Sequence, residues 1–117
     1  MSDPIPRTWG LYVTDMLTAA RKVAQYTQSL DFESFVSDEL VYDATLRNLA
    51  LIGEAARQIP SDVRDSNPEI PWRMIIAARN QLIHGYLGID DQIIWSIIHD
   101  DLPSLIEALV NLDSATG

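Results

Sequence analysis

The feature that most constrains the fold is the spacing of apolar residues, which follows the period of an α-helix along nearly the whole chain of 117 residues. Apolar residues recur three and four positions apart, and proline and glycine lie at the boundaries of these runs. No stretch alternates apolar and polar residues for long enough to indicate a strand. The sequence therefore predicts an all-α fold, and its length suits a single domain over residues 1–117.

Two long helices are expected in the first half of the chain. The first runs from about Thr8 to Tyr26, and a short helical turn follows from Asp31. The second begins after Ser37, a residue type that caps helix N-termini, and its apolar stripe continues to Ile59. The residues expected to be buried are Leu11, Met16 and Val23 on the first helix and Val41, Thr45, Asn48, Ile52, Ala55 and Ile59 on the second. The small residues Gly53, Ala55 and Ala56 permit another helix to approach closely.

Two further helices are expected in the second half. The segment "PSDVRDSNPEIP" between Pro60 and Pro71 has the composition of a connecting loop with one short helical turn. The run "WRMIIAARNQLIH" after Pro71 predicts the third helix, and Asp90 is the expected N-cap of the fourth, which Pro103 kinks or divides. The whole pattern predicts a bundle of four main helices with short extra turns, an architecture that hosts many functions.

Composition narrows the possible functions. Seventeen Asp and Glu residues oppose eight Lys and Arg, giving a formal net charge of −9. Proteins that hold nucleic acid by counterion release carry basic patches, so nucleic-acid chemistry here would depend on a few locally placed arginines. The chain has no cysteine, which excludes disulfides and thiolate metal sites. It has no signal-like N-terminus and no apolar run long enough for a membrane span, so we expect a soluble, cytoplasmic protein that does not act at a membrane.

Polar residues cluster near the end of the third predicted helix, in the stretch "ARNQLIHGY". On a regular helix Asn80 and His84 share a face, whereas Arg79 lies about 140° around the axis from His84. One interpretation is structural: Arg79 pairs with an Asp or Glu elsewhere in the bundle, and His84 binds a carbonyl. The other is functional: Arg79 and His84 converge, either because the helix end is irregular at Gly85 or because a two-fold partner brings a second copy of the cluster against the first. The residues themselves leave both interpretations open.

The remaining candidate groups have simpler interpretations. The neighbouring acids Asp90 and Asp91, and Asp100 and Asp101, suit helix caps and solvated faces better than a metal site, because adjacent helical residues point about 100° apart. His99 is expected at the surface or in a hydrogen bond. The three tryptophans are spread over three helices and suit the core or an interface: Trp9, Trp72 and Trp95. We therefore predict no metal site and no cofactor.

The order of several motifs resembles the HepT-type toxins of the HEPN superfamily. These are small helical ribonucleases in which an arginine is followed, after four residues, by a histidine and, two positions later, by a tyrosine. The segment "RNQLIHGY", preceded by "IPW" and followed by "DDQIIWSIIHDDLPSL", has this pattern. The upstream segments "DMLTAARKVAQYT" and "YDATLRNLALIGEAA" are also similar to the family, so the resemblance covers about Asp15 to Leu105.

The resemblance implies a metal-independent endoribonuclease that acts on RNA as a homodimer, with the two motif helices meeting in a cleft. In this sequence it makes Arg79 and His84 the catalytic pair and Asn80 a supporting residue. It also implies a cognate antitoxin with a minimal nucleotidyltransferase fold, which neutralises the toxin by adenylylating Tyr86. The alternative is a non-catalytic HEPN module that docks a nucleotidyltransferase.

Overall fold

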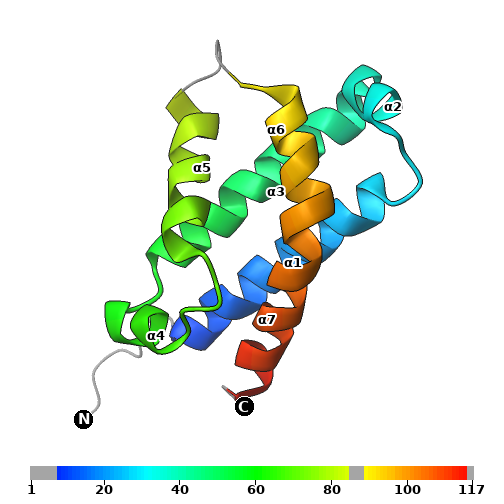
Figure 1. Cartoon of the computed structure of the whole chain (residues 1–117). Coiled ribbons are helices and arrows are strands. Elements are labelled where there is room, and N and C mark those ends of the chain that lie inside the picture. Colours follow the sequence, from blue (N-terminus) through cyan, green and yellow to red (C-terminus); the bar gives the residue numbers. More distant parts are fainter. Residues whose placement is uncertain (1–7, 85–88, 116–117) are drawn as a thin grey trace.

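The computed structural model describes residues 8–84 and 89–115, and its account of residues 83 and 84 is limited to the backbone. The described chain is helical and contains no strand, which confirms the all-α prediction (Figure 1). Three of the main helices are α1 (Trp9–Thr27), α3 (Glu39–Arg57) and α5 (Trp72–His84). The fourth consists of α6 (Asp91–Ser96), a π-helical turn η1 (Ile97–Asp101) and α7 (Leu102–Ala115). The short helices are α2 (Phe32–Ser37) and α4 (Ser61–Ser66).

The core lies where α1 and α3 pack against each other, with α5 against α3 and α7 against α1 (Figure 1). Met16 and Val23 of α1 and Ile52 of α3 are buried, as the helical spacing predicts. The expectation for Leu11 was wrong, because this side chain is 48% exposed. Leu11 lies five residues before Met16 and therefore points about 140° away from it around the helix axis.

Aspartate side chains cap the starts of three helices, α2, α3 and α6. Asp38, and not Ser37 as expected, caps α3: its carboxylate accepts a hydrogen bond from the backbone N–H of Val41 at 3.1 Å. Ser37 instead ends α2, and its hydroxyl donates to the carbonyl of Glu33 at 2.8 Å. Asp90 caps α6, as expected, by accepting from the backbone N–H of Gln92 at 2.9 Å. An aspartate suits these positions because its negative charge also faces the positive end of the helix.

The fourth main helix changes its winding ahead of Pro103. The backbone N–H of Leu102 donates to the carbonyl of Ile97, five residues earlier, which defines the π turn η1. Proline has no N–H, and its ring collides with the carbonyl four residues before it in a regular α-helix, here that of His99. Widening the preceding turn is a way to relieve this conflict. The predicted division is present, but it begins at Ile97, upstream of the proline.

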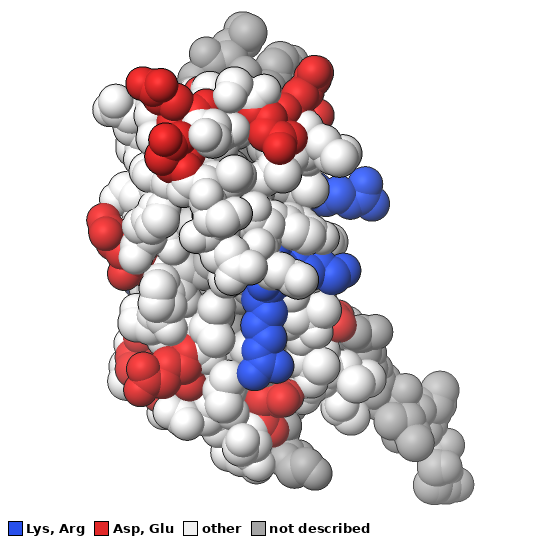
Figure 2. Space-filling view, turned by 90° about the vertical axis from the view of Figure 1, so that its right-hand side faces the viewer, with Lys and Arg blue, Asp and Glu red and all other residues white. Residues whose placement is uncertain are grey.

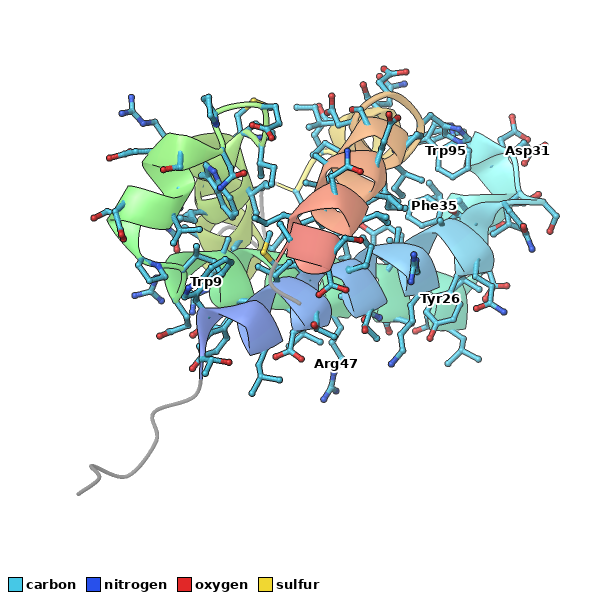
Figure 3. All side chains as sticks on the ribbon, turned by 90° about the horizontal axis from the view of Figure 1, so that it is seen from below. Trp9, Tyr26, Asp31, Phe35, Arg47 and Trp95 are labelled. Atoms are coloured by element: carbon cyan, nitrogen blue, oxygen red, sulfur yellow. The ribbon has the colours of Figure 1, made fainter. Side chains whose placement is uncertain are left out.

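An aromatic cluster joins α2, α3 and α6. The ring centroid of Phe35 lies 5.4 Å from that of Tyr42 and 5.1 Å from that of Trp95 (Figure 3). The Tyr42 hydroxyl donates a hydrogen bond to the carboxylate of Asp91. Burial, together with this bond and the charge of Asp91, raises the pKa of Tyr42 to about 12. The first turn of α6 is thereby held against α3.

Trp72 is buried, and Trp9 and Trp95 are partly buried against the core, in agreement with the structural role predicted for the tryptophans. Among the described residues, none of the helices is long and apolar enough to cross a bilayer.

The Tyr42 contact gives a pH-dependent prediction. Its folded-state pKa lies above the ordinary value of 10.0, so the contribution to stability is fully present below about pH 10 and is lost as the pH rises through about 12. The Tyr42→Phe variant removes the hydrogen bond and should lower the free energy of unfolding by about 1 kcal/mol at neutral pH. Denaturant titrations between pH 7 and 12 should show the difference between variant and wild type shrinking above pH 10. A constant difference over this range would contradict the assignment.

Candidate active site

The aliphatic stem of the Arg79 side chain, its Cβ and Cγ atoms, crosses α3 directly over Gly53. A Cβ atom placed on Gly53 would lie 2.2 Å from the Cβ and 2.9 Å from the Cγ of Arg79, and 3.0 Å from the backbone oxygen of Ile75. No side chain fits in this space, so the glycine is what lets α5 lie against α3 at this point. The close approach expected from the small residues of α3 is therefore found at the arginine of the candidate motif.

The Arg79 guanidinium is held between two acceptors. Its Nη2 atom lies 2.7 Å from Oε2 of Glu54, and its Nη1 donates to Oδ1 of Asn80 at 3.0 Å. Its Nε is buried and has no partner within the described part of the chain. The side chain keeps 18% of its surface exposed. Arg79 is thus fixed in orientation by Glu54 and Asn80 while part of it stays open to solvent.

Glu54 is the functional residue that the sequence reasoning missed. The segment "IGEAA" was considered only for its small residues and its family resemblance, yet its acid is the ion-pair partner of Arg79. Glu54 also lies 3.5 Å from Nη1 of Arg57, so one carboxylate stands between two guanidinium groups. The formal sum of these three groups is one positive charge. One sequence signal points to Glu54. It directly follows Gly53, the glycine that leaves room for the aliphatic part of the Arg79 side chain.

This arrangement suits an oxyanion ligand. A guanidinium offers five N–H donors in a planar fork, and Glu54 and Asn80 use only part of them. A phosphate oxygen that reaches the exposed edge of Arg79 would meet a donor that is permanently charged and already oriented. Arg79 therefore pairs with an acid of the bundle, as the structural interpretation predicts. Its guanidinium nevertheless still reaches the surface.

His84 and Tyr86 complete the predicted site, but their side chains lie outside the described residues. The backbone of α5 is helical through His84, so the Cα atoms of Arg79 and His84 lie about 140° apart around the axis. The described structure brings together Arg79, Asn80 and Glu54. The positions of His84 and Tyr86 relative to them stay predictions.

The other candidate groups have structural roles. Asp90 caps α6, Asp91 accepts from Tyr42, and Asp100 accepts from the Ser96 hydroxyl at 2.9 Å. His99 is exposed, and its ring centroid lies 4.2 Å from that of Trp95. Within residues 8–82 and 89–115, no group of three or more His, Asp or Glu side chains is arranged to hold a metal ion.

Comparison with known proteins matches this chain to one family. The family model for HepT-like ribonucleases matches residues 16–112. A protein of Thermococcus cleftensis named "Probable ribonuclease HepT" is 38% identical over 94 residues, which span 80% of this chain and 86% of that protein. A protein of Methanocaldococcus jannaschii named "Putative RNase MJ1380" is 36% identical over 94 residues, again 80% of this chain and 86% of the relative. No solved structure matches the chain with comparable significance.

The matched region contains α3, α5 and the whole Arg79 to Tyr86 segment. The chain belongs to the HepT-like ribonuclease family. Its activity is accordingly that of a ribonuclease, and its substrate is RNA.

The contact at Gly53 predicts the effect of adding one methyl group. Replacing a helical glycine with alanine normally stabilises a helix by about 1 kcal/mol. Here Gly53→Ala should instead destabilise the protein by roughly 1–2 kcal/mol, because the methyl group collides with the Arg79 stem. Thermal unfolding measures the sign of the change. A Tm equal to or above that of the wild type would show that α3 and α5 do not approach as closely as described.

Proposed function

We propose that this chain is the toxin of a toxin-antitoxin pair and a metal-independent endoribonuclease whose active site is shared by two copies of the chain. Arg79 and His84 form the catalytic pair, Asn80 supports Arg79, and adenylylation of Tyr86 by a cognate nucleotidyltransferase neutralises the enzyme. The observation that carries this proposal is the Arg79 guanidinium held between Glu54 and Asn80, five residues before His84 in a chain of the HepT-like family.

The proposed reaction is an internal transesterification. A His84 imidazole takes the proton from the ribose 2′-hydroxyl, and the 2′-oxygen forms a new bond to phosphorus as the bond to the 5′-oxygen breaks. The His84 imidazole of the second copy, protonated before the reaction begins, gives its proton to the leaving 5′-oxygen, so one histidine gains a proton as the other loses one. Arg79 stabilises the negative charge on the non-bridging oxygens. The products carry a 2′,3′-cyclic phosphate and a 5′-hydroxyl, and no metal ion takes part.

Imidazole suits both proton transfers, because its ordinary pKa near 6.5 lets it act as an acid or as a base at neutral pH. One copy of the chain supplies only one His84, so a two-fold dimer is the simplest way to obtain the pair. The exposed apolar residues Met74 on α5, 61% exposed, and Ile93 on α6, 58% exposed, support an interface beside the motif helix. Together with Ala78 and Ile97 they line apolar grooves along α5 and α6.

The catalytic assignment predicts the response to three changes. His84→Ala and Arg79→Ala should each lower the cleavage rate by about 10²–10⁴-fold, because each removes a group that acts on the reacting phosphate. Adding EDTA should leave the wild-type rate unchanged. The measurement is cleavage of a labelled RNA, with the end groups of the fragments identified by mass spectrometry.

The chain supplies matched controls. His99→Ala removes the other histidine, which lies against Trp95, and Arg73→Ala removes an exposed arginine in the first turn of α5. Both should retain cleavage. Activity that survives His84→Ala, or that EDTA abolishes, would contradict the mechanism.

Two further outcomes concern the dimer and the alternative function. A stable monomer in light scattering at micromolar concentration would contradict the shared site. An inactive wild type that binds the nucleotidyltransferase would favour the non-catalytic module.

The neutralisation step is tested at Tyr86. Transfer of AMP forms a bond between the tyrosine oxygen and the α-phosphorus of ATP and releases pyrophosphate, and the tyrosine proton passes to solvent. The added phosphodiester is an anion that can occupy the donors of Arg79 in place of the RNA phosphate. Incubation with the cognate nucleotidyltransferase, ATP and Mg²⁺ should add the mass of AMP to the wild type and stop RNA cleavage.

Tyr86→Phe is the matched variant because it removes only the hydroxyl. It should keep RNA cleavage, gain no AMP mass and stay active in the presence of the nucleotidyltransferase. AMP retained by this variant would place the modification at another residue. Inhibition of the variant as complete as that of the wild type would assign neutralisation to binding alone.

A further inference from the structure

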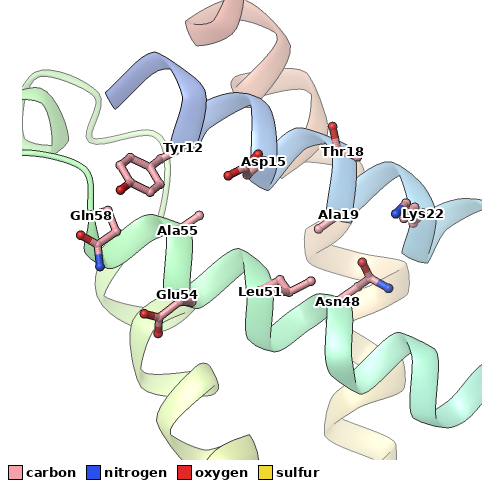
Figure 4. Close-up of a pocket in the computed structure, with 10 residues that line it drawn as sticks. All are labelled: Tyr12, Asp15, Thr18, Ala19, Lys22, Asn48, Leu51, Glu54, Ala55 and Gln58. Carbon is pink, nitrogen blue, oxygen red and sulfur yellow. The ribbon is translucent and has the colours of Figure 1, made fainter. Parts of the chain in front are cut away.

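A groove of about 490 Å³ lies between the outer faces of α1 and α3 (Figure 4). Its polar lining comes from both sides: Tyr12, Asp15, Thr18 and Lys22 of α1, Asn48 and Glu54 of α3, and Gln58 directly after α3. None of these seven residues belongs to the family motif around Arg79. The groove is therefore a feature of the fold that the catalytic assignment leaves unexplained.

Glu54 connects the groove to the candidate active site. It lines the groove, and its carboxylate is also the group that lies 2.7 Å from Nη2 of Arg79. Figure 4 shows the Glu54 side chain pointing from α3 to the side away from α1. Glu54 is therefore shared by the wall of the groove and the ion pair that holds Arg79.

The far end of the groove carries unpaired positive charge. Lys22, the only lysine of the chain, is exposed and makes no ion pair within the described residues. Arg47, next to the groove residue Asn48, is likewise exposed and points away from the bundle (Figure 3). Figure 2 shows Lys and Arg side chains in the centre and on the right of one face, with acidic side chains above them, below them and along the left edge. In a chain with more than twice as many acids as bases, cations left unpaired beside a groove favour an anionic ligand.

The two carboxylates of the groove do not cancel this charge. Glu54 is already neutralised by Arg79 and Arg57. Asp15 is engaged in an interaction of its own and lies about two helical turns from Lys22 along α1. The attraction for an anion is therefore concentrated at the end of the groove formed by Lys22 and Asn48.

Asn48 adds a group that can recognise a base. Its side chain is largely buried, 8% exposed, and its Nδ2 donates to the carbonyl of Ala44 at 2.8 Å. Its Oδ1 has no protein partner in the described part of the chain, and its amide faces the Lys22 side of the groove (Figure 4). Amide groups bind the polar edges of unpaired bases, which are exposed only in single-stranded RNA. Tyr12, at the other end, offers an aromatic ring of the type on which bases stack.

We propose that this groove binds the nucleotides of single-stranded RNA that neighbour the cleaved phosphate, with Lys22 holding a phosphate and Asn48 contacting a base. The inference rests on the proposed function, because it takes Arg79 as the site of the cleaved phosphate. Asn48 lies six residues before Glu54, roughly 9 Å along the axis of α3, which sets the length of RNA that the groove covers. Recognition of flanking nucleotides would let an acidic enzyme select unpaired RNA without a basic surface.

The test measures RNA binding separately from cleavage. A short, unstructured, fluorescently labelled RNA is titrated against the full chain carrying His84→Ala, and then against the same chain with Lys22→Glu added. We expect roughly tenfold weaker binding and a slope of log K against log salt that is smaller by about 0.7, the value for one phosphate contact on a single strand. In the otherwise unchanged enzyme, Lys22→Glu should raise KM and leave kcat nearly unchanged, since Lys22 is remote from the reacting bonds.

Arg21→Glu is the matched control. It makes the same charge reversal on the neighbouring exposed residue of α1, which does not line the groove. It should weaken binding by much less and leave the salt slope unchanged. Equal losses of RNA affinity in the two variants would mean that only the overall charge of the protein matters, and would overturn the proposal. RNA binding unaffected by Lys22→Glu would also overturn it. A Lys22→Glu variant that keeps its RNA affinity but loses the nucleotidyltransferase would assign the groove to a protein partner and also overturn it.

A second measurement locates the RNA directly. RNA containing 4-thiouridine is photo-crosslinked to the His84→Ala protein, and the crosslinked peptides are identified by mass spectrometry. Crosslinks within residues 12–22 or 48–58 support the groove, and crosslinks confined to other segments overturn it. These outcomes do not depend on cleavage. If the wild type fails to cut RNA, the proposed function fails while the binding and crosslinking results still decide whether the groove holds RNA.

Discussion

The approach of α5 to α3 at Gly53 determines the rest of the candidate site. Because Gly53 has no side chain, the Arg79 stem lies against the backbone of α3, and the next residue of that helix, Glu54, meets the guanidinium at 2.7 Å. One local packing constraint therefore fixes both the position and the orientation of the arginine. The same contact couples stability to the proposed function, because a change that spreads the two helices also displaces the arginine proposed to bind the RNA phosphate.

The acidic composition and an RNA substrate are compatible because the relevant charges are local. Glu54 lies between Arg79 and Arg57, so the carboxylate that orients Arg79 adds no free negative charge to the site. Four aspartates elsewhere have structural roles, as caps of α2, α3 and α6 and as the partner of Tyr42. The proposed RNA contacts are a few local groups, whereas a broadly basic surface would hold any polyanion.

Helical periodicity predicted the four main helices, the short turns and most of the core, because burial on a helix follows directly from residue spacing. Leu11 was misplaced because it lies outside the angular range of the buried stripe although it is apolar, and Ser37 was chosen as a cap where the following Asp38 reaches the N–H of Val41. The roles predicted for Arg79, His84 and Tyr86 come from the resemblance to the HepT-type toxins, because the helix pattern alone left two interpretations open. Glu54 was missed because its pairing with Arg79 depends on which helices pack together, and periodicity within a single helix carries no information about that.

The π turn between α6 and α7 takes up one extra residue within a single turn. The helices on either side can therefore keep nearly the directions that they would have in one continuous helix. Ile94 on α6, Ile98 within η1, and Leu102 and Leu105 on α7 are all buried. Loss of a single residue between Ile97 and Asp101 would close this turn to a regular α-helix, in which the proline ring of Pro103 collides with the carbonyl four residues before it. This segment should therefore accept substitutions far more readily than changes in length.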